Sequence, residues 1–177
     1  MRCGALLRAG GGVRLGRRPG ELWRRSRYAG PYLRDALLDR GVLVETLETA
    51  ASWSNLEALY GAVGNALRES LAGCGTPPLV MGHISHLYRS GASLYFTFLA
   101  RRDDVAPLEQ WRTAKLAASE AILATGGTIT HHHAVGRDHA PYMRAEVGDV
   151  GVDALRALKQ RLDPAGIMNP GKLLPGA

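Results

Sequence analysis

The spacing of apolar residues between positions 42 and 132 alternates between two periods, and the order of these periods restricts the fold most. Stretches with period two are typical of strands, whereas repeats every third or fourth residue are typical of helices. The order strand, helix, strand, strand, helix, strand predicts an α+β fold of the ferredoxin-like kind, an antiparallel sheet with helices on one face. The expected strands are 42–49, 79–88, 93–100 and 128–132, and the expected helices are 54–73 and 107–125.

The flanks of this unit divide the chain into three parts. A Gly/Arg-rich leader, 1–22, is expected to be disordered because it buries little apolar surface. Residues 23–134 form the cap domain, and it begins with a helix over 23–40. Residues 135–177 hold a last helix, 153–162, and an irregular tail.

The positive charge is concentrated in the first part of the chain. Residues 1–40 contain ten Arg and three acids, whereas the remainder has twelve bases and thirteen acids, a balance of −1. This distribution argues against a nucleic-acid binder, and no apolar run has the ~20 residues of a membrane span. The two cysteines, Cys3 and Cys74, form no spaced motif, which favours a reducing compartment.

Three consecutive histidines, 131–133, are the strongest chemical signal. On an extended backbone, His131 and His133 point one way and His132 the other, which is poor geometry for one metal, so no metal is expected. The arrangement suits imidazoles along a wall that contacts an anionic or polar substrate, or else a solvated loop. His83 and His86, three apart on a strand, are expected to face opposite sides and to be structural.

Tyr95 lies in the strand SLYFTFLA, on the face shared by Thr97 and Leu99 and opposite Phe96 and Phe98. A phenol with cations nearby can serve as a general base. The other interpretation is a cross-strand aromatic that only stabilises the sheet.

Two further segments carry candidate residues. Arg137 follows the histidines closely and could grip phosphate, although arginines are often simply exposed. The turn-rich motif 163–172 carries Ile167 and Met168, which are expected to dock on a partner.

Four segments occur together in an order that resembles a known family: VLVETLETAASWSNL, SLYFTF, GGTITHHHAVG and DPAGIMNPGKLL. They resemble the C-terminal region of the FAD-linked oxidases related to vanillyl-alcohol oxidase. Within that superfamily, the chain is most similar to the alkyldihydroxyacetonephosphate synthase (alkylglycerone-phosphate synthase) family, over residues 23–174. The histidine triplet distinguishes this family from the related 2-hydroxyacid dehydrogenases, which carry Gly-Glu-His-Gly at that place.

The resemblance implies an FAD-dependent enzyme that exchanges the acyl group of acyl-dihydroxyacetone phosphate for a fatty alcohol, in ether-lipid synthesis. It implies Tyr95, His132 and His133 as catalytic residues. His131 and Arg137 are the expected substrate-binding residues, and Asn169 in the tail is the expected cofactor contact.

The family places an FAD-binding domain before this region. We therefore expect FAD to be held mainly by a domain outside this chain, in cis or in trans, on which residues 135–177 pack. A homodimer is also expected, in the cytoplasm with membrane association, or in the peroxisome of a eukaryote. Two alternatives stay open: the cap of a related FAD-linked oxidase or dehydrogenase acting on a hydroxyacid or alcohol, and a non-catalytic gene fragment.

Overall fold

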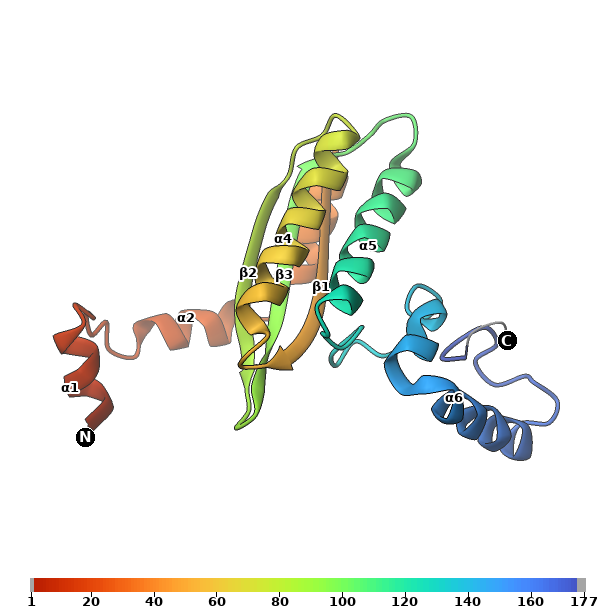
Figure 1. Ribbon diagram of the computed structural model, residues 1–177. Coiled ribbons are helices and arrows are strands. Elements are labelled where there is room, and N and C mark those ends of the chain that lie inside the picture. Colours follow the sequence, from red (N-terminus) through yellow and green to blue (C-terminus); the bar gives the residue numbers. More distant parts are fainter. Residues whose placement is uncertain (1, 175–177) are drawn as a thin grey trace.

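The computed structural model describes residues 2–174, which fold around a three-stranded antiparallel sheet (Figure 1). The strands are β1 (Val42–Ser52), β2 (Leu79–Leu87) and β3 (Gly91–Arg101), in the order β1-β3-β2. Helices α4 (Leu56–Gly73) and α5 (Pro107–Ala124) lie side by side over one face of the sheet. The expected α+β class and the expected hairpin of β2 and β3 are confirmed.

The core lies between this face and the two helices. In α4, Leu59, Val63, Leu67 and Leu71 are fully buried because they recur at helical spacing. Alternate residues of β3 pack against them: Ala92, Leu94, Phe96, Phe98 and Ala100. The residues between these, Tyr95 among them, therefore point to the opposite face of the sheet, as the sequence pattern predicts.

The expected fourth strand, 128–132, is not formed, and that prediction is wrong. The segment does run along β1, where the N–H of Thr128 donates to Ala50 O at 2.9 Å and the N–H of His131 to Glu48 O at 3.0 Å. Between these points the N–H of Ile129 donates to a carboxylate oxygen of Glu146 at 2.9 Å. A ladder cannot continue because His132 has φ 64°, in the left-handed region.

A bulge in β2 changes which side chains share the open face. Ile84 pairs with Leu94 and Leu87 with Ala92, so two residues of β2, Ser85 and His86, stand opposite Ser93 alone. Ser93 Oγ bonds both, at 2.6 Å to Ser85 Oγ and 3.0 Å to the N–H of His86. The expectation that His83 and His86 face opposite sides is therefore wrong.

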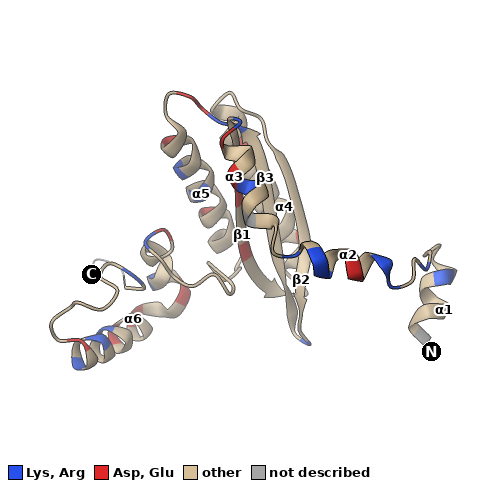
Figure 2. Cartoon of the chain, turned by 180° about the vertical axis from the view of Figure 1, so that it is seen from behind, with Lys and Arg blue, Asp and Glu red and all other residues tan. Residues whose placement is uncertain are grey.

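The region before β1 contains helices α1 (Arg2–Ala9), α2 (Arg18–Ser26) and α3 (Gly30–Leu38). The leader expected to be disordered is thus helical in part, with its described side chains exposed. The expected helix over 23–40 is interrupted at 27–29, between the end of α2 and the start of α3, and the proline in the first turn of α3 has no N–H for a continuous helix. Figure 2 shows the basic residues along α1 and α2, and α3 on the sheet face opposite α4 and α5, against β1.

The chain after the histidines forms a short 3₁₀ helix (Ala140–Tyr142) and α6 (Met143–Leu162). The predicted helix 153–162 is only the end of α6, which is kinked at Gly148, where φ is 72° and ψ is 172°. The tail then turns back, and the N–H of Leu173 donates to Val135 O at 3.2 Å. Within residues 2–174, no helix combines the length and the apolar character needed to cross a bilayer.

A substitution at Gly91 tests how closely β1 and β3 approach each other beside the hairpin turn. A Cβ at this position would lie 2.0 Å from Ala51 O, so Gly91→Ala forces the strands apart. We expect a loss of roughly 1–3 kcal/mol in the free energy of unfolding, measured with urea. Gly61→Ala is the matched control, because a Cβ there meets no atom within 4 Å and alanine favours the helix. Equal stability of the two variants would contradict the packing argument.

Candidate functional site

The open face of the sheet carries a row of polar and aromatic side chains. Glu48 on β1, Tyr95 on β3 and His83 on β2 are register partners, so they lie across the sheet on one line. The rings of His83 and Tyr95 have centroids 5.4 Å apart. The ring of His133 meets Tyr95 edge-on from the other side, at 5.7 Å and 81°. Tyr95 and the histidine segment therefore do lie on the same side of the sheet.

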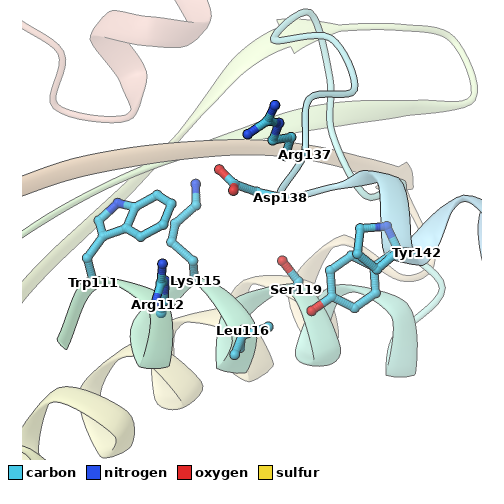
Figure 3. A pocket seen from close by; sticks show the side chains of 9 residues that line it. Trp111, Arg112, Lys115, Leu116, Ser119, Arg137, Asp138 and Tyr142 are labelled. Atoms are coloured by element: carbon cyan, nitrogen blue, oxygen red, sulfur yellow. The ribbon is translucent and has the colours of Figure 1, made fainter. Parts of the chain in front are cut away.

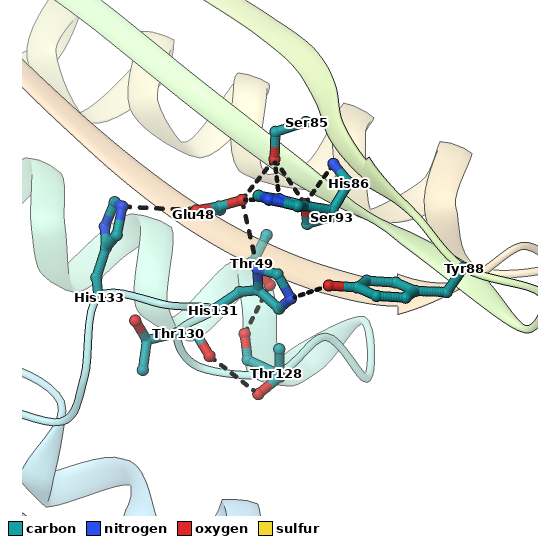
Figure 4. Close-up of polar contacts among 10 residues, drawn as sticks. All are labelled: Glu48, Thr49, Ser85, His86, Tyr88, Ser93, Thr128, Thr130, His131 and His133. Atoms are coloured by element: carbon teal, nitrogen blue, oxygen red, sulfur yellow. Dashed lines mark hydrogen bonds and ion pairs between the residues drawn. The ribbon is translucent and has the colours of Figure 1, made fainter.

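Glu48 is the centre of this face, although its side chain is almost completely buried (Figure 4). Its Oε1 accepts a hydrogen bond from Ser85 Oγ at 2.5 Å, and the Nδ1 atoms of His86 and His131 each lie 3.3 Å from it. Its Oε2 lies 3.5 Å from His133 Nε2. One carboxylate thus joins β1, the bulge of β2 and the segment after α5.

Burial and hydrogen bonding have opposite effects on the charge state of Glu48. Burial raises the pKa of its carboxyl, but hydrogen bonds from Ser85, Ser93, His131 and His86 stabilise the ionised form and outweigh burial. Together these effects lower the pKa of Glu48 from 4.5 to about 2. Glu48 is therefore a carboxylate at neutral pH, and it can only accept hydrogen bonds.

The hydrogen bonds of His131 determine which of its nitrogens carries the proton. A carboxylate accepts only, so the Nδ1 atom that faces Glu48 is the one that donates. In a neutral ring the Nε2 atom is then an acceptor, and it lies 3.1 Å from the hydroxyl of Tyr88. The side chain is 17% exposed, which leaves it little freedom to leave this pair of contacts.

The triplet does not alternate as an extended strand would. His131 and His133 point the same way, as expected, and both reach Glu48, but the positive φ of His132 stacks its ring on His131 at 4.1 Å. The ring of His132 also lies 4.4 Å from that of His86. Ring nitrogens of His86, His131 and His132 lie within 4.8 Å of one another, so within residues 2–174 these three side chains form a group that could hold a metal ion.

Arg137 lies in another part of the molecule's surface. It lines a cleft of about 230 Å³ on α5, together with Trp111 and Lys115. Figure 3 shows Arg137 and Asp138 reaching over this cleft from the segment opposite α5. The volume is below the ~300 Å³ at which ligand pockets usually begin, so the cleft suits a small group rather than a lipid.

Asn169, the expected cofactor contact, is exposed in the tail, with φ 46°. The preceding turn is held by Asp163, whose carboxylate accepts the N–H groups of Ile167 at 3.1 Å and Met168 at 2.9 Å. Ile167 is 75% exposed and Met168 is 61% exposed. The turn therefore presents these apolar side chains outward, as the sequence suggests.

Sequence reasoning missed several residues of this face: Glu48, Ser85, His86, Tyr88 and Ser93. The sequence does indicate a role for Glu48, since a carboxyl in the middle of the strand VLVETLETA needs hydrogen-bond partners if the strand is buried. It gives no such indication for Ser85 and His86, because their orientation depends on the bulge.

The chain matches the family described as FAD linked oxidases, C-terminal domain, over residues 5–173. It is 36% identical over 161 residues to an alkyldihydroxyacetonephosphate synthase of Dictyostelium discoideum, covering 91% of this chain and 26% of the relative. The corresponding protein of Trypanosoma brucei brucei is also 36% identical, over 170 residues, with 96% of this chain and 28% of the relative covered.

A solved structure of an alkyldihydroxyacetonephosphate synthase is similar to this chain as well. It superposes with a TM-score of 0.61 at 28% identity, over 90% of this chain and 25% of that one. The chain therefore spans about a quarter of the length of the relatives it matches.

The charge of Glu48 makes a testable contribution to stability. Because its folded-state pKa of about 2 lies below 4.5, this contribution is fully present above pH 4.5 and is lost as the pH falls through about 2. We expect Glu48→Gln to lower the free energy of unfolding near neutral pH by roughly 1–3 kcal/mol, because the hydrogen bonds to a charged acceptor are weakened. The gap between wild type and variant should close between pH 4.5 and 2 in urea titrations followed by circular dichroism.

Glu69→Gln, at an exposed position of α4, is the control for this experiment and should show no such gap. A gap for Glu48→Gln that stays constant over the whole pH range would mean that shape, not charge, accounts for the loss.

Proposed function

This chain belongs to the family of FAD-linked oxidase C-terminal domains, and we propose that it is the substrate-facing part of an FAD-dependent alkylglycerone-phosphate synthase. Such an enzyme exchanges the acyl group of acyl-dihydroxyacetone phosphate for a fatty alcohol. The names of the relatives support this reaction, and so does the phenol with its imidazoles on the sheet face that α4 and α5 leave open.

In this proposal FAD is held mainly by another domain. That domain, in cis or in trans, brings the FAD to the open face of the sheet. The side chains on this face can contact an incoming FAD, because His86 and His133 are 44% and 39% exposed and offer ring nitrogens for hydrogen bonds. When bound, FAD supplies the electron-accepting ring that the exchange needs although there is no net redox change. Asn169 and the exposed Ile167 and Met168 of the tail would contact this domain. A homodimer is the assembly we propose.

Tyr95 is the proposed base that removes a proton next to the substrate ketone. The observation that carries this role is the contact of its ring with His133, 5.7 Å between centroids, on a sheet face that α4 and α5 leave open. His83 flanks the same ring at 5.4 Å. Imidazoles on both sides can orient the phenol and relay its proton.

The remaining residues have supporting roles in this proposal. His132 and His133 act with Tyr95 at the reacting carbon, and His131 helps to bind the substrate. Glu48 holds His131 and His133 in place through its two carboxylate oxygens. Arg137 is proposed to bind the phosphate, and its small cleft with Lys115 has the charge and size for such a group.

Tyr95→Phe tests the proposal. The chain would be co-expressed with the FAD-binding domain of the Dictyostelium discoideum relative, and incorporation of labelled fatty alcohol into the ether product would be measured. We expect the rate to fall by about 100-fold or more, because the phenol oxygen that accepts the proton is gone. Tyr60→Phe is the matched control, since Tyr60 stacks on Phe96 at the helix side of the sheet and should keep full activity.

Full exchange by Tyr95→Phe would remove Tyr95 from the mechanism. Reduction of the flavin by a hydroxyacid, with no exchange by the wild-type complex, would favour a related oxidase instead.

A further inference from the structure

A second hydroxyl group on the open face is connected to Glu48 through an imidazole. The Tyr88 hydroxyl lies 3.1 Å from His131 Nε2, and His131 Nδ1 lies 3.3 Å from Glu48 Oε1 (Figure 4). The chain of contacts runs from a side chain that is 47% exposed to a carboxylate that is 5% exposed. Hydroxyl, imidazole and carboxylate in this order form the arrangement that moves protons in many enzymes.

We propose that Tyr88, His131 and Glu48 form a proton relay, separate from Tyr95, that accepts the proton released by the incoming fatty alcohol. This inference rests on the proposed synthase function and assigns a second acid–base group to the same face.

The exchange needs such a group because it releases a proton. The alcohol oxygen forms a bond to the dihydroxyacetone carbon, and its O–H bond breaks. The bond from that carbon to the acyl oxygen also breaks, and the electron pair leaves with the fatty acid as a carboxylate. The proton of the alcohol is therefore left over. Tyr95, which is assigned the proton next to the ketone, cannot hold both protons at once.

The three side chains can carry this proton in a defined direction. The phenol oxygen of Tyr88 takes the proton of the alcohol while its own proton passes to His131 Nε2. His131 then carries a positive charge beside the ionised Glu48, which stabilises it as a buried carboxylate does in a catalytic triad. The exposed side of Tyr88 returns the proton to water afterwards.

The fold fixes both ends of the relay. The backbone N–H of His131 donates to Glu48 O at 3.0 Å, and Trp53 Nε1 donates to the backbone oxygen of Tyr88 at 3.2 Å. The Glu48 carboxylate cannot swing away, since Ser85 Oγ donates to it at 2.5 Å and Ser93 Oγ in turn lies 2.6 Å from Ser85 Oγ. Glu48 is thus a positioning residue that acts through His131.

The first test uses the full chain alone, with ¹⁵N-labelled histidine, and needs neither flavin nor substrate. Nuclear magnetic resonance should find the His131 proton on Nδ1 in wild type and in Tyr88→Phe. In Glu48→Gln that Nδ1–H signal should be lost or move markedly upfield, because the charged acceptor is gone. A wild-type His131 that carries its proton on Nε2 overturns the relay, whatever the outcome of activity assays.

The second test measures exchange in the complex with the FAD-binding domain. We expect Tyr88→Phe to lower kcat by about 100-fold with little change in KM for the acyl substrate, and to remove one limb of the pH–rate profile. Tyr60→Phe on the helix side of the sheet, where Tyr60 stacks on Phe96, is the control, and it should leave kcat unchanged. Full kcat in Tyr88→Phe overturns the relay. Absence of exchange even in the wild type would instead count against the synthase function, and the resonance test would then decide the relay.

Discussion

Glu48 lies in the middle of β1 with 5% of its surface exposed, where an isolated charge would cost several kcal/mol. The chain offsets this cost with hydrogen bonds from Ser85, His86 and His131, drawn from two separate segments. The same contacts therefore keep the carboxylate ionised and hold the imidazoles in place. Because the donors come from the β2 bulge and the segment after α5, the geometry of the open face depends on this one group.

The two faces of the sheet differ in composition and in exposure to solvent. The face under α4 and α5 is mainly apolar, with Phe96 and Phe98 fully buried, and it stabilises the fold. On the other face α3 packs on β1 and the histidine segment contacts Glu48, while several aromatic and ionisable side chains stay partly accessible. A helix pair on one side thus leaves the other side partly accessible, in a chain that matches the family of FAD linked oxidases, C-terminal domain.

Regular patterns predicted the regular parts of the molecule. Alternation in SLYFTFLA gave the correct face for Tyr95, and the predicted helix 54–73 formed with Leu59, Val63 and Leu67 in the core. The expected fourth strand failed because a run of β-favouring residues, TITH, does not reveal that His132 adopts a positive φ or that Glu146 takes the N–H of Ile129. Contacts between residues far apart in the sequence decide such points, and local propensity cannot contain them.

The irregularity in β2 has a consequence for how such a site is recognised in other sequences. Between Ile84 and Leu87 the strand holds one residue more than its partner, and this surplus alone puts His86 beside Glu48. In a regular strand with the same residues and no bulge, His86 would pair with Ala92 and its imidazole would turn toward the helices. Counting the spacing from Tyr95 back to the bulge is therefore a sharper criterion for homologous chemistry than the presence of the histidine itself.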